Sequence, residues 1–153
     1  MSEHIKQYWQ AFLASTARAA ETTYLESFYF GHGEAMANEL LALVLRGQKT
    51  ATASSLDYYQ VTGNARPQVG DLSIVTDWAG TPQGVIQTMK VSLLKFKDMT
   101  YEICQREGED DTLASWQQNH RAYFITEGQQ VGYAFHEDMM ILFEDFRLLD
   151  PHG

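Results

Sequence analysis

Two segments in the middle of the chain alternate between apolar and polar residues, and a short run typical of a turn separates them. The segments span residues 69–78 and 84–96, and the residues between them include Gly80 and Pro82. An alternating pattern places every second side chain on one face of a β-strand, and Gly and Pro favour a tight connection. The two segments therefore predict an antiparallel hairpin, and residues 139–149 predict a further strand.

Helical segments precede and follow this hairpin. Apolar residues in the first third recur three or four positions apart, which is the spacing of one helix face. The helices that we expect span residues 4–19, 34–46, 100–107 and 113–126. Helices followed by strands, further helices and a closing strand predict an α+β fold with a curled, mostly antiparallel sheet. The pattern leaves open whether this sheet closes into a small barrel.

Length and composition indicate one soluble domain. The chain has 153 residues without an internal repeat or a long linker, a length at which a single core suffices. No apolar run approaches the roughly 18 residues of a membrane span, and residues 1–18 lack the pattern of a signal peptide. The single cysteine, Cys104, fits a reducing compartment, so we expect a cytoplasmic protein with no membrane partner.

The net charge of −9 is unevenly distributed. Residues 46–97 carry three acidic and six basic side chains, whereas residues 98–153 carry twelve acidic and three basic ones. The acidic last third disfavours a long anionic polymer lying across the surface, so no DNA partner is expected. The basic middle third remains compatible with a nucleic-acid component, and the charge favours a small nucleoside over RNA.

Residues 46–56, RGQKTATASSL, carry the most distinctive chemistry. A desolvated lysine can act as a base toward a hydroxyl nucleophile, and Lys49 lies three positions before Thr52. The two side chains share one side only if the chain turns before a strand begins, and Gly47 favours such a turn. The alternative is a strand whose small residues pack against a neighbour.

This segment resembles the signature of the ASCH domain family, GxKxxTxR. Gly47, Lys49 and Thr52 match it, whereas Ser54 stands in place of the arginine. Further stretches, PxVGDLSIVTDxxGxP, EGEDDTLxxWxxxH and FxED, resemble a longer bacterial subgroup. The resemblance implies a small PUA-like, mostly antiparallel β-barrel with a cleft at the motif. It also implies a single ASCH domain over residues 1–153, with residues 1–30 as a helical N-terminal extension.

Relatives of this kind include amidohydrolases that remove the acetyl group of acetylcytidine by means of a lysine, a threonine and a glutamate. The resemblance implies Lys49, Thr52 and Glu107 in these roles, with Glu109 as a competitor for the last. A carboxylate at a helix C-terminus meets the negative end of the dipole, which predicts a raised pKa for Glu107 and suits a proton donor. Lys49 would deprotonate Thr52 or a water that attacks the acetyl carbonyl.

Further residues are candidates for substrate binding. Trp116 and His120 lie one turn apart on a predicted helix, where they either line the cleft and stack on a base or face the core. Gly47, Thr50 and Ser54 are candidates because they belong to the motif segment. The histidines lack the spacing of metal ligands, so we expect neither a metal nor a cofactor.

Two other functions remain open at this point. The first is a ribonuclease acting on single-stranded RNA, in which Lys49 would hold a phosphate. The second is a non-catalytic module that binds RNA or a nucleotide in the same pocket. Binding of a polymer would weaken steeply as salt rises, whereas binding of an uncharged nucleoside would hardly respond.

Overall fold

The computed structural model describes residues 2–149, which form five α-helices and five β-strands. The helices are α1 (Glu3–Ser15), α2 (Glu34–Leu45), α3 (Leu56–Thr62), α4 (Tyr101–Cys104) and α5 (Leu113–Val131). The strands are β1 (Ser27–Phe28), β2 (Ala51–Ser55), β3 (Leu72–Thr76), β4 (Pro82–Lys95) and β5 (Met140–Leu149). Two short 3₁₀ helices, η1 (Phe96–Asp98) and η2 (Gln105–Glu107), flank α4.

The strands form one sheet in the order β1-β3-β4-β5-β2. Three of the four pairings are antiparallel, and only β1 and β3 run parallel. The expected α+β class, the mostly antiparallel sheet and the hairpin of β3 and β4 are therefore confirmed. The sheet does not close into the small barrel that the resemblance implied, because β1 and β2 do not pair with each other within residues 2–149.

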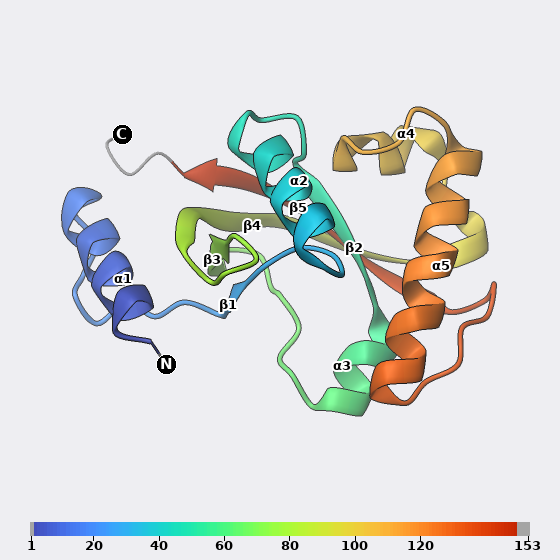
Figure 1. Ribbon diagram of the computed structural model, residues 1–153, viewed down its shortest axis with the longest axis horizontal. Coiled ribbons are helices and arrows are strands. Elements are labelled where there is room, and N and C mark those ends of the chain that lie inside the picture. Colours follow the sequence, from blue (N-terminus) through green and yellow to red (C-terminus); the bar gives the residue numbers. More distant parts are fainter. Residues whose placement is uncertain (1, 150–153) are drawn as a thin grey trace.

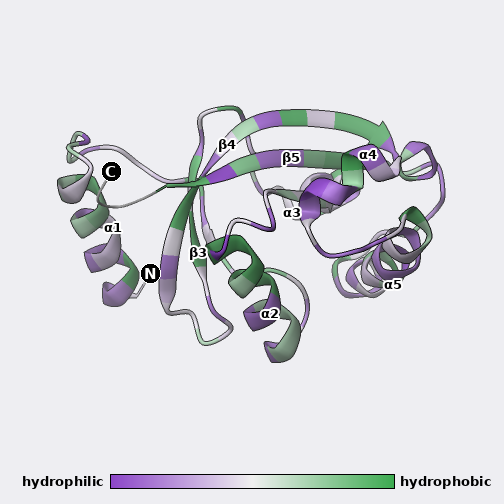
Figure 2. Ribbon diagram, turned by 90° about the horizontal axis from the view of Figure 1, so that it is seen from above, coloured by the Kyte–Doolittle hydropathy of each residue, from purple (hydrophilic) through white to green (hydrophobic). Residues whose placement is uncertain are grey.

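The long strands β4 and β5 form a curved ribbon that extends through most of the molecule (Figure 1). Helices α1 and α5 lie near opposite ends of this ribbon. Figure 2 shows that α2 and α5 lie on the same, concave side of the ribbon. This curvature brings segments that are far apart in the sequence into one neighbourhood between α2, β2 and α5.

Each of three helices buries an apolar face against a different part of the sheet. The helix α1 packs through Ile5, Trp9, Phe12 and Leu13 against β3 and β4. The helix α2 contributes Leu41 and Val44 to a second cluster, which includes Phe30 and Phe146. The helix α5 contributes Trp116 and Phe124 to a third cluster with Phe96, Ile141 and Phe143. Of the two alternatives left open for Trp116, the cleft wall and the core, the structure shows the core.

The helix α3 has no counterpart among the expected elements. It spans only seven residues, begins at the cap Ser55, whose hydroxyl accepts a hydrogen bond from the backbone N–H of Tyr58, and ends at Gly63 with φ of +75°. So short a helix presents too few apolar residues for a periodic pattern. It matters for the site because it carries Tyr58 and Tyr59.

The N-terminal helix α1 is attached to the sheet rather than separate from it. The indole of Trp9 packs edge-on against Tyr24, and its Nε1 donates to the Thr22 carbonyl oxygen at 2.9 Å.

The division of the chain stays a prediction, both the single domain over residues 1–153 and the N-terminal extension over residues 1–30. Residues 1 and 150–153 lie outside the part that the structure describes. No helix within residues 2–149 is long and apolar enough to cross a membrane.

Candidate functional site

A cavity of about 470 Å³ opens between the β2 edge of the sheet, the residues around β1, and helices α3 and α5. Such a volume accommodates a small-molecule ligand. Its wall is rich in aromatic side chains, namely Phe28, Tyr29, Phe30, Tyr58, Tyr59 and Tyr123. The polar residues among its lining include Lys49, Thr52, Ser54, Glu107 and His120, so the curvature of the sheet brings these predicted site residues together.

Lys49 lies in the connection between α2 and β2. Gly47, with φ of +79°, turns the chain after the helix, and the backbone N–H of Lys49 donates to the Leu43 carbonyl. The side chain is only 1% exposed. Its Nζ donates to the Ala51 carbonyl oxygen at 2.7 Å, to Glu109 Oε2 at 2.5 Å and to Glu107 Oε1 at 3.5 Å. All three ammonium hydrogens therefore have acceptors.

Glu107 is the last residue of η2 and is 1% exposed. Its Oε2 accepts a hydrogen bond from the Trp116 indole N–H, and its Oε1 faces Lys49 and, at 3.4 Å, His120 Nε2. Burial alone would raise the pKa of this carboxyl, but His120, Lys49 and the hydrogen bonds outweigh burial and lower it. The prediction of a raised pKa is therefore wrong, because it considered the helix dipole without the two cations.

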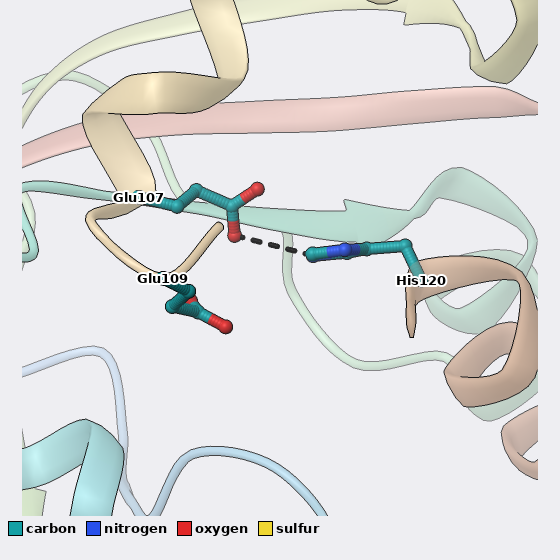
Figure 3. A group of neighbouring side chains, drawn as sticks. All are labelled: Glu107, Glu109 and His120. Carbon is teal, nitrogen blue, oxygen red and sulfur yellow. Dashed lines mark hydrogen bonds and ion pairs between the residues drawn. The ribbon is translucent and has the colours of Figure 1, made fainter. Parts of the chain in front are cut away.

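His120 extends from α5 toward Glu107 (Figure 3). Its ring stacks on Trp116 at a centroid distance of 4.2 Å, and its Nδ1 lies 2.9 Å from the Trp116 carbonyl oxygen. A carbonyl and a carboxylate only accept hydrogen bonds, so the imidazolium, which donates from both nitrogens, satisfies both neighbours. Burial lowers the pKa of His120, but Glu107 outweighs burial and raises it above its ordinary value.

Glu109 follows Gly108 in the loop after η2 and is more accessible, with a side chain that is 21% exposed. Burial raises the pKa of this carboxyl, and the neighbouring Glu107 adds to the effect, while Lys49 opposes both. The net direction is upward. The two glutamates thus have opposite tendencies: Glu107 holds its negative charge strongly, whereas Glu109 accepts a proton more readily than an ordinary glutamate.

Thr52 and Ser54 lie on β2 and line the cavity. Thr52 is the direct cross-strand partner of Glu144, so both side chains leave the sheet on the same face. Within residues 2–149 the Thr52 hydroxyl has no hydrogen-bond partner, which leaves it available to a ligand. Burial raises the pKa of Tyr59 to about 12, and Ser54, which stands in place of the motif arginine, opposes this increase.

Three predicted site residues do not line the cavity. Trp116 is fully buried, so its indole supports Glu107 instead of stacking on a ligand. Thr50 donates from its hydroxyl to the Arg106 carbonyl at 3.1 Å and thereby ties the start of β2 to η2. Gly47 provides the turn before Lys49. These three residues hold the site residues in position, and none of them lines the cavity in which a ligand would bind.

Glu107, Glu109 and His120 each offer one atom to a group in which all three atoms lie within 4.8 Å of one another. Such a group has the donor types of a metal site. The Lys49 ammonium, however, already lies against both carboxylates. A cation of the protein itself thus balances their charge, so the donor set does not fit a metal while Lys49 keeps this position.

Several cavity residues were not identified from the sequence. Glu144 lies in the apolar strand β5, and a charged residue within such a run was a usable signal. Tyr58 and Tyr59 lie on α3, which was not expected. Phe30 lies between the expected helices 4–19 and 34–46, where no element was predicted, and its ring centroid lies 5.3 Å from Lys49 Nζ.

The ASCH domain model matches residues 26–150, so the chain belongs to the ASCH domain family. The chain is 34% identical to an ASCH domain of Lactobacillus crispatus JV V101, with a TM-score of 0.88, covering 97% of this chain and 95% of the other. It is 30% identical to protein EF3133 of Enterococcus faecalis V583, with a TM-score of 0.90 and coverages of 98% and 90%. The hypothetical protein PH0355, at 15% identity and a TM-score of 0.51 over 83% of this chain and 100% of the other, shares the fold alone.

No curated protein resembles the chain significantly. The resemblance to the ASCH family that the motif indicated is therefore confirmed, as is the PUA-like character of the fold. Membership in this family suggests an RNA-related binding role or a hydrolase-type role. The arrangement of side chains in the cavity distinguishes the binding role from the hydrolase role.

Proposed function

We propose that this protein is a cytoplasmic hydrolase that cleaves the acetyl amide of acetylcytidine to give cytidine and acetate. One observation carries the proposal: the Lys49 ammonium bridges Glu107 and Glu109 in the cavity that the unpartnered Thr52 hydroxyl also lines. A nucleophile, a group that moves protons and a charged support are the parts that acyl transfer needs. Aromatic walls suit a flat base.

Proton transfer begins at the Lys49–Glu109 contact. Lys49 passes a proton from Nζ to Glu109 Oε2, which is 2.5 Å away and belongs to a carboxyl with a raised pKa. The free amine then takes the proton of the Thr52 hydroxyl or of a water, whose oxygen forms a bond to the acetyl carbon. The π bond of the acetyl carbonyl breaks at the same time, and its electron pair moves to the carbonyl oxygen. Lys49 is thereby returned to its ammonium form.

Collapse of the resulting tetrahedral intermediate breaks the bond between the acetyl carbon and the exocyclic nitrogen. Glu109 gives its proton to that nitrogen, which leaves as the amine of cytidine, and the carboxylate is restored. If Thr52 is the nucleophile, a water repeats the attack on the resulting acetyl ester. The bond between the acetyl carbon and the Thr52 oxygen then breaks, acetate leaves, and Glu109 returns a proton to the Thr52 oxygen in the same way. We place the proton donor at Glu109 instead of Glu107, because the lowered pKa keeps Glu107 ionised.

Glu107 and His120 support this chemistry without donating a proton in it. Glu107 holds Lys49 from one side and is held in turn by His120 and Trp116. Such a rigid charged support keeps a proton-transfer group within hydrogen-bond reach of its target. Removing it would displace Lys49 from its contacts with Glu109 and the Ala51 carbonyl.

The test is incubation of the purified full chain with acetylcytidine and, separately, with labelled single-stranded RNA. The Lys49→Ala variant serves as the control in both reactions. Release of cytidine by the wild type alone supports the proposal, whereas cleavage of RNA by the wild type alone would support the ribonuclease. Binding of either probe without any reaction would support a binding module.

A further inference from the structure

The charges that line the cavity carry information about its ligand beyond the reaction itself. Five carboxylates line it, namely Glu26, Glu107, Glu109, Glu127 and Glu144, whereas Lys49 is its one lysine or arginine. Lys49 is already committed to Glu107, Glu109 and the Ala51 carbonyl. The His120 imidazolium, which also lines the cavity, is committed to Glu107 and the Trp116 carbonyl. No uncommitted basic side chain among the lining residues can therefore receive a phosphate group.

The other three carboxylates of the cavity, unlike Glu107 and Glu109, have no basic partner among the described residues. Glu26, Glu127 and Glu144 form no ion pair within residues 2–149. Glu127 accepts a hydrogen bond from the Tyr133 hydroxyl at 2.7 Å, and Glu144 Oε2 accepts one from the Thr88 hydroxyl at 2.6 Å. Glu144 Oε1 and both carboxylate oxygens of Glu26 remain free of such partners in the same part of the chain.

Glu26 and Glu144 line the same cavity as the reacting groups, and the charge of Glu26 acts on Glu144. Glu144 stands directly across from Thr52 on the neighbouring strand, and Glu26 immediately precedes β1 at the opposite edge of the sheet. Burial raises the pKa of both carboxyls, and the charge of Glu26 adds to the effect on Glu144. A further negative group brought between them would be repelled by both.

From this distribution of charge we infer that the cavity selects an unphosphorylated ligand, and that Glu26 and Glu144 form the subsite responsible. Carboxylate oxygens accept hydrogen bonds from sugar hydroxyls, so the same pair that repels a phosphate can hold the ribose of a nucleoside. The chemical class selected is an uncharged nucleoside, and nucleotides and RNA are excluded. This inference rests on the proposed function and deepens it.

Arg66 provides the strongest competing possibility. It lies between Ala65 and Pro67, which both line the cavity, but its own side chain is exposed and is not part of the lining. A phosphate that protruded from the mouth could reach such a side chain. An Arg66→Ala variant distinguishes this possibility, because it leaves the carboxylates of the cavity unchanged.

The test is calorimetric titration of the full chain with cytidine and with cytidine 5′-monophosphate, both at low ionic strength. We expect cytidine to bind at least about tenfold more tightly than the monophosphate, a difference of about 1.4 kcal/mol. In the Glu26→Gln/Glu144→Gln variant this preference shrinks toward equal affinity, because the amides keep the size of the side chains but lose both charges. Thermal unfolding verifies that the variant is folded, and Glu144→Gln alone, which leaves an oxygen to accept from Thr88, serves as the milder second variant.

Equal or tighter binding of the monophosphate by the wild type would overturn the inference, most clearly if Arg66→Ala then weakened it. An unchanged preference in both glutamine variants would overturn the role of Glu26 and Glu144. Binding of neither probe would also overturn the inference. Release of cytidine from acetylcytidine tests the proposed reaction separately. Failure of the proposed reaction and failure of the proposed selection against phosphate are therefore distinguishable.

Discussion

The Nζ atom of Lys49 lies 2.5 Å from Glu109 Oε2, and this contact joins the motif segment to the loop that follows η2. The two residues are far apart in the sequence and lie together because Thr50 and Gln48 also bond to that region. Gly108 is essential to this approach, since it has φ of +71° and a Cβ there would lie 2.3 Å from the Gln48 carbonyl oxygen.

Thr52 offers the sharpest distinction between a nucleophile and a structural residue. Its hydroxyl has no partner within residues 2–149, so Thr52→Ala should change the free energy of unfolding by less than about 1 kcal/mol. The same variant should lower kcat for acetylcytidine by about a hundredfold or more, whereas Thr52→Ser should retain most of it. Steady-state kinetics and thermal unfolding of the two variants provide the comparison, and full activity of Thr52→Ala would leave water as the nucleophile.

The two glutamates should respond differently to loss of charge. Glu109→Gln should lower kcat by about a hundredfold, the size of a typical acid–base contribution, with a modest effect on stability. Glu107→Gln should destabilise the protein by about 3 kcal/mol, because Lys49 and His120 would lose a buried partner. Chemical denaturation beside kinetics of both variants measures the contrast. Equal losses of stability in Glu107→Gln and Glu109→Gln would contradict a supporting role for Glu107 and a proton-donor role for Glu109.

The ion pair of Glu107 and His120 should make stability depend on pH. Although burial lowers the pKa of His120, Glu107 raises it overall, so the folded value lies above the unfolded one. The stabilising effect is therefore fully present below the ordinary value of about 6.5 and is lost as pH rises through the raised folded value.

A series of unfolding measurements from pH 6 to pH 9 tests this dependence. The difference in unfolding free energy between the wild type and His120→Gln should decrease as pH increases, by at most about 1.4 kcal/mol per pH unit. The His120→Gln variant cancels contributions from other titrating groups. A constant difference would show that folding does not change the pKa of His120, and a difference that grew with pH would show that folding lowers it; either result would contradict the ion pair.

Trp116 should act on stability and on the position of Glu107 without contacting the ligand. Trp116→Phe retains an aromatic ring but removes the N–H that bonds Glu107, which should cost about 1–3 kcal/mol of stability. Because the indole does not line the cavity, the affinity for cytidine should stay within about twofold of the wild-type value. Calorimetric titration of cytidine measures this affinity, and a loss of binding greater than tenfold would place the indole against the ligand.

Much of the fold could be predicted because it follows from local patterns. The alternation over β3, β4 and β5 and the apolar stripes of α1 and α2 are repeated over many residues, so each element was recognisable. The seven-residue α3 and the two-residue β1 carry no such repetition. The open edge between β1 and β2 depends on pairing between distant segments, which no local pattern specifies.

The candidate site was predictable only where it coincides with a motif. Lys49, Thr52 and Ser54 are close in sequence, and the resemblance to the ASCH family identified them together. Glu26 and Glu144 both line the cavity, but only Glu144, a charged residue within an apolar strand, carries a local signal of this. The direction of the Glu107 pKa likewise depends on Lys49 and His120, whose approach is a tertiary contact.

The central claim is that Lys49 and Thr52 together hydrolyse the amide of acetylcytidine, and chromatographic measurement of cytidine and acetate tests it most directly. The full chain at neutral pH should release the two products in equal amounts, and Lys49→Ala and Thr52→Ala, if folded by thermal unfolding, should reduce the rate by about a hundredfold or more. Release at the spontaneous rate by the wild type, or unchanged release by either variant, would contradict the claim.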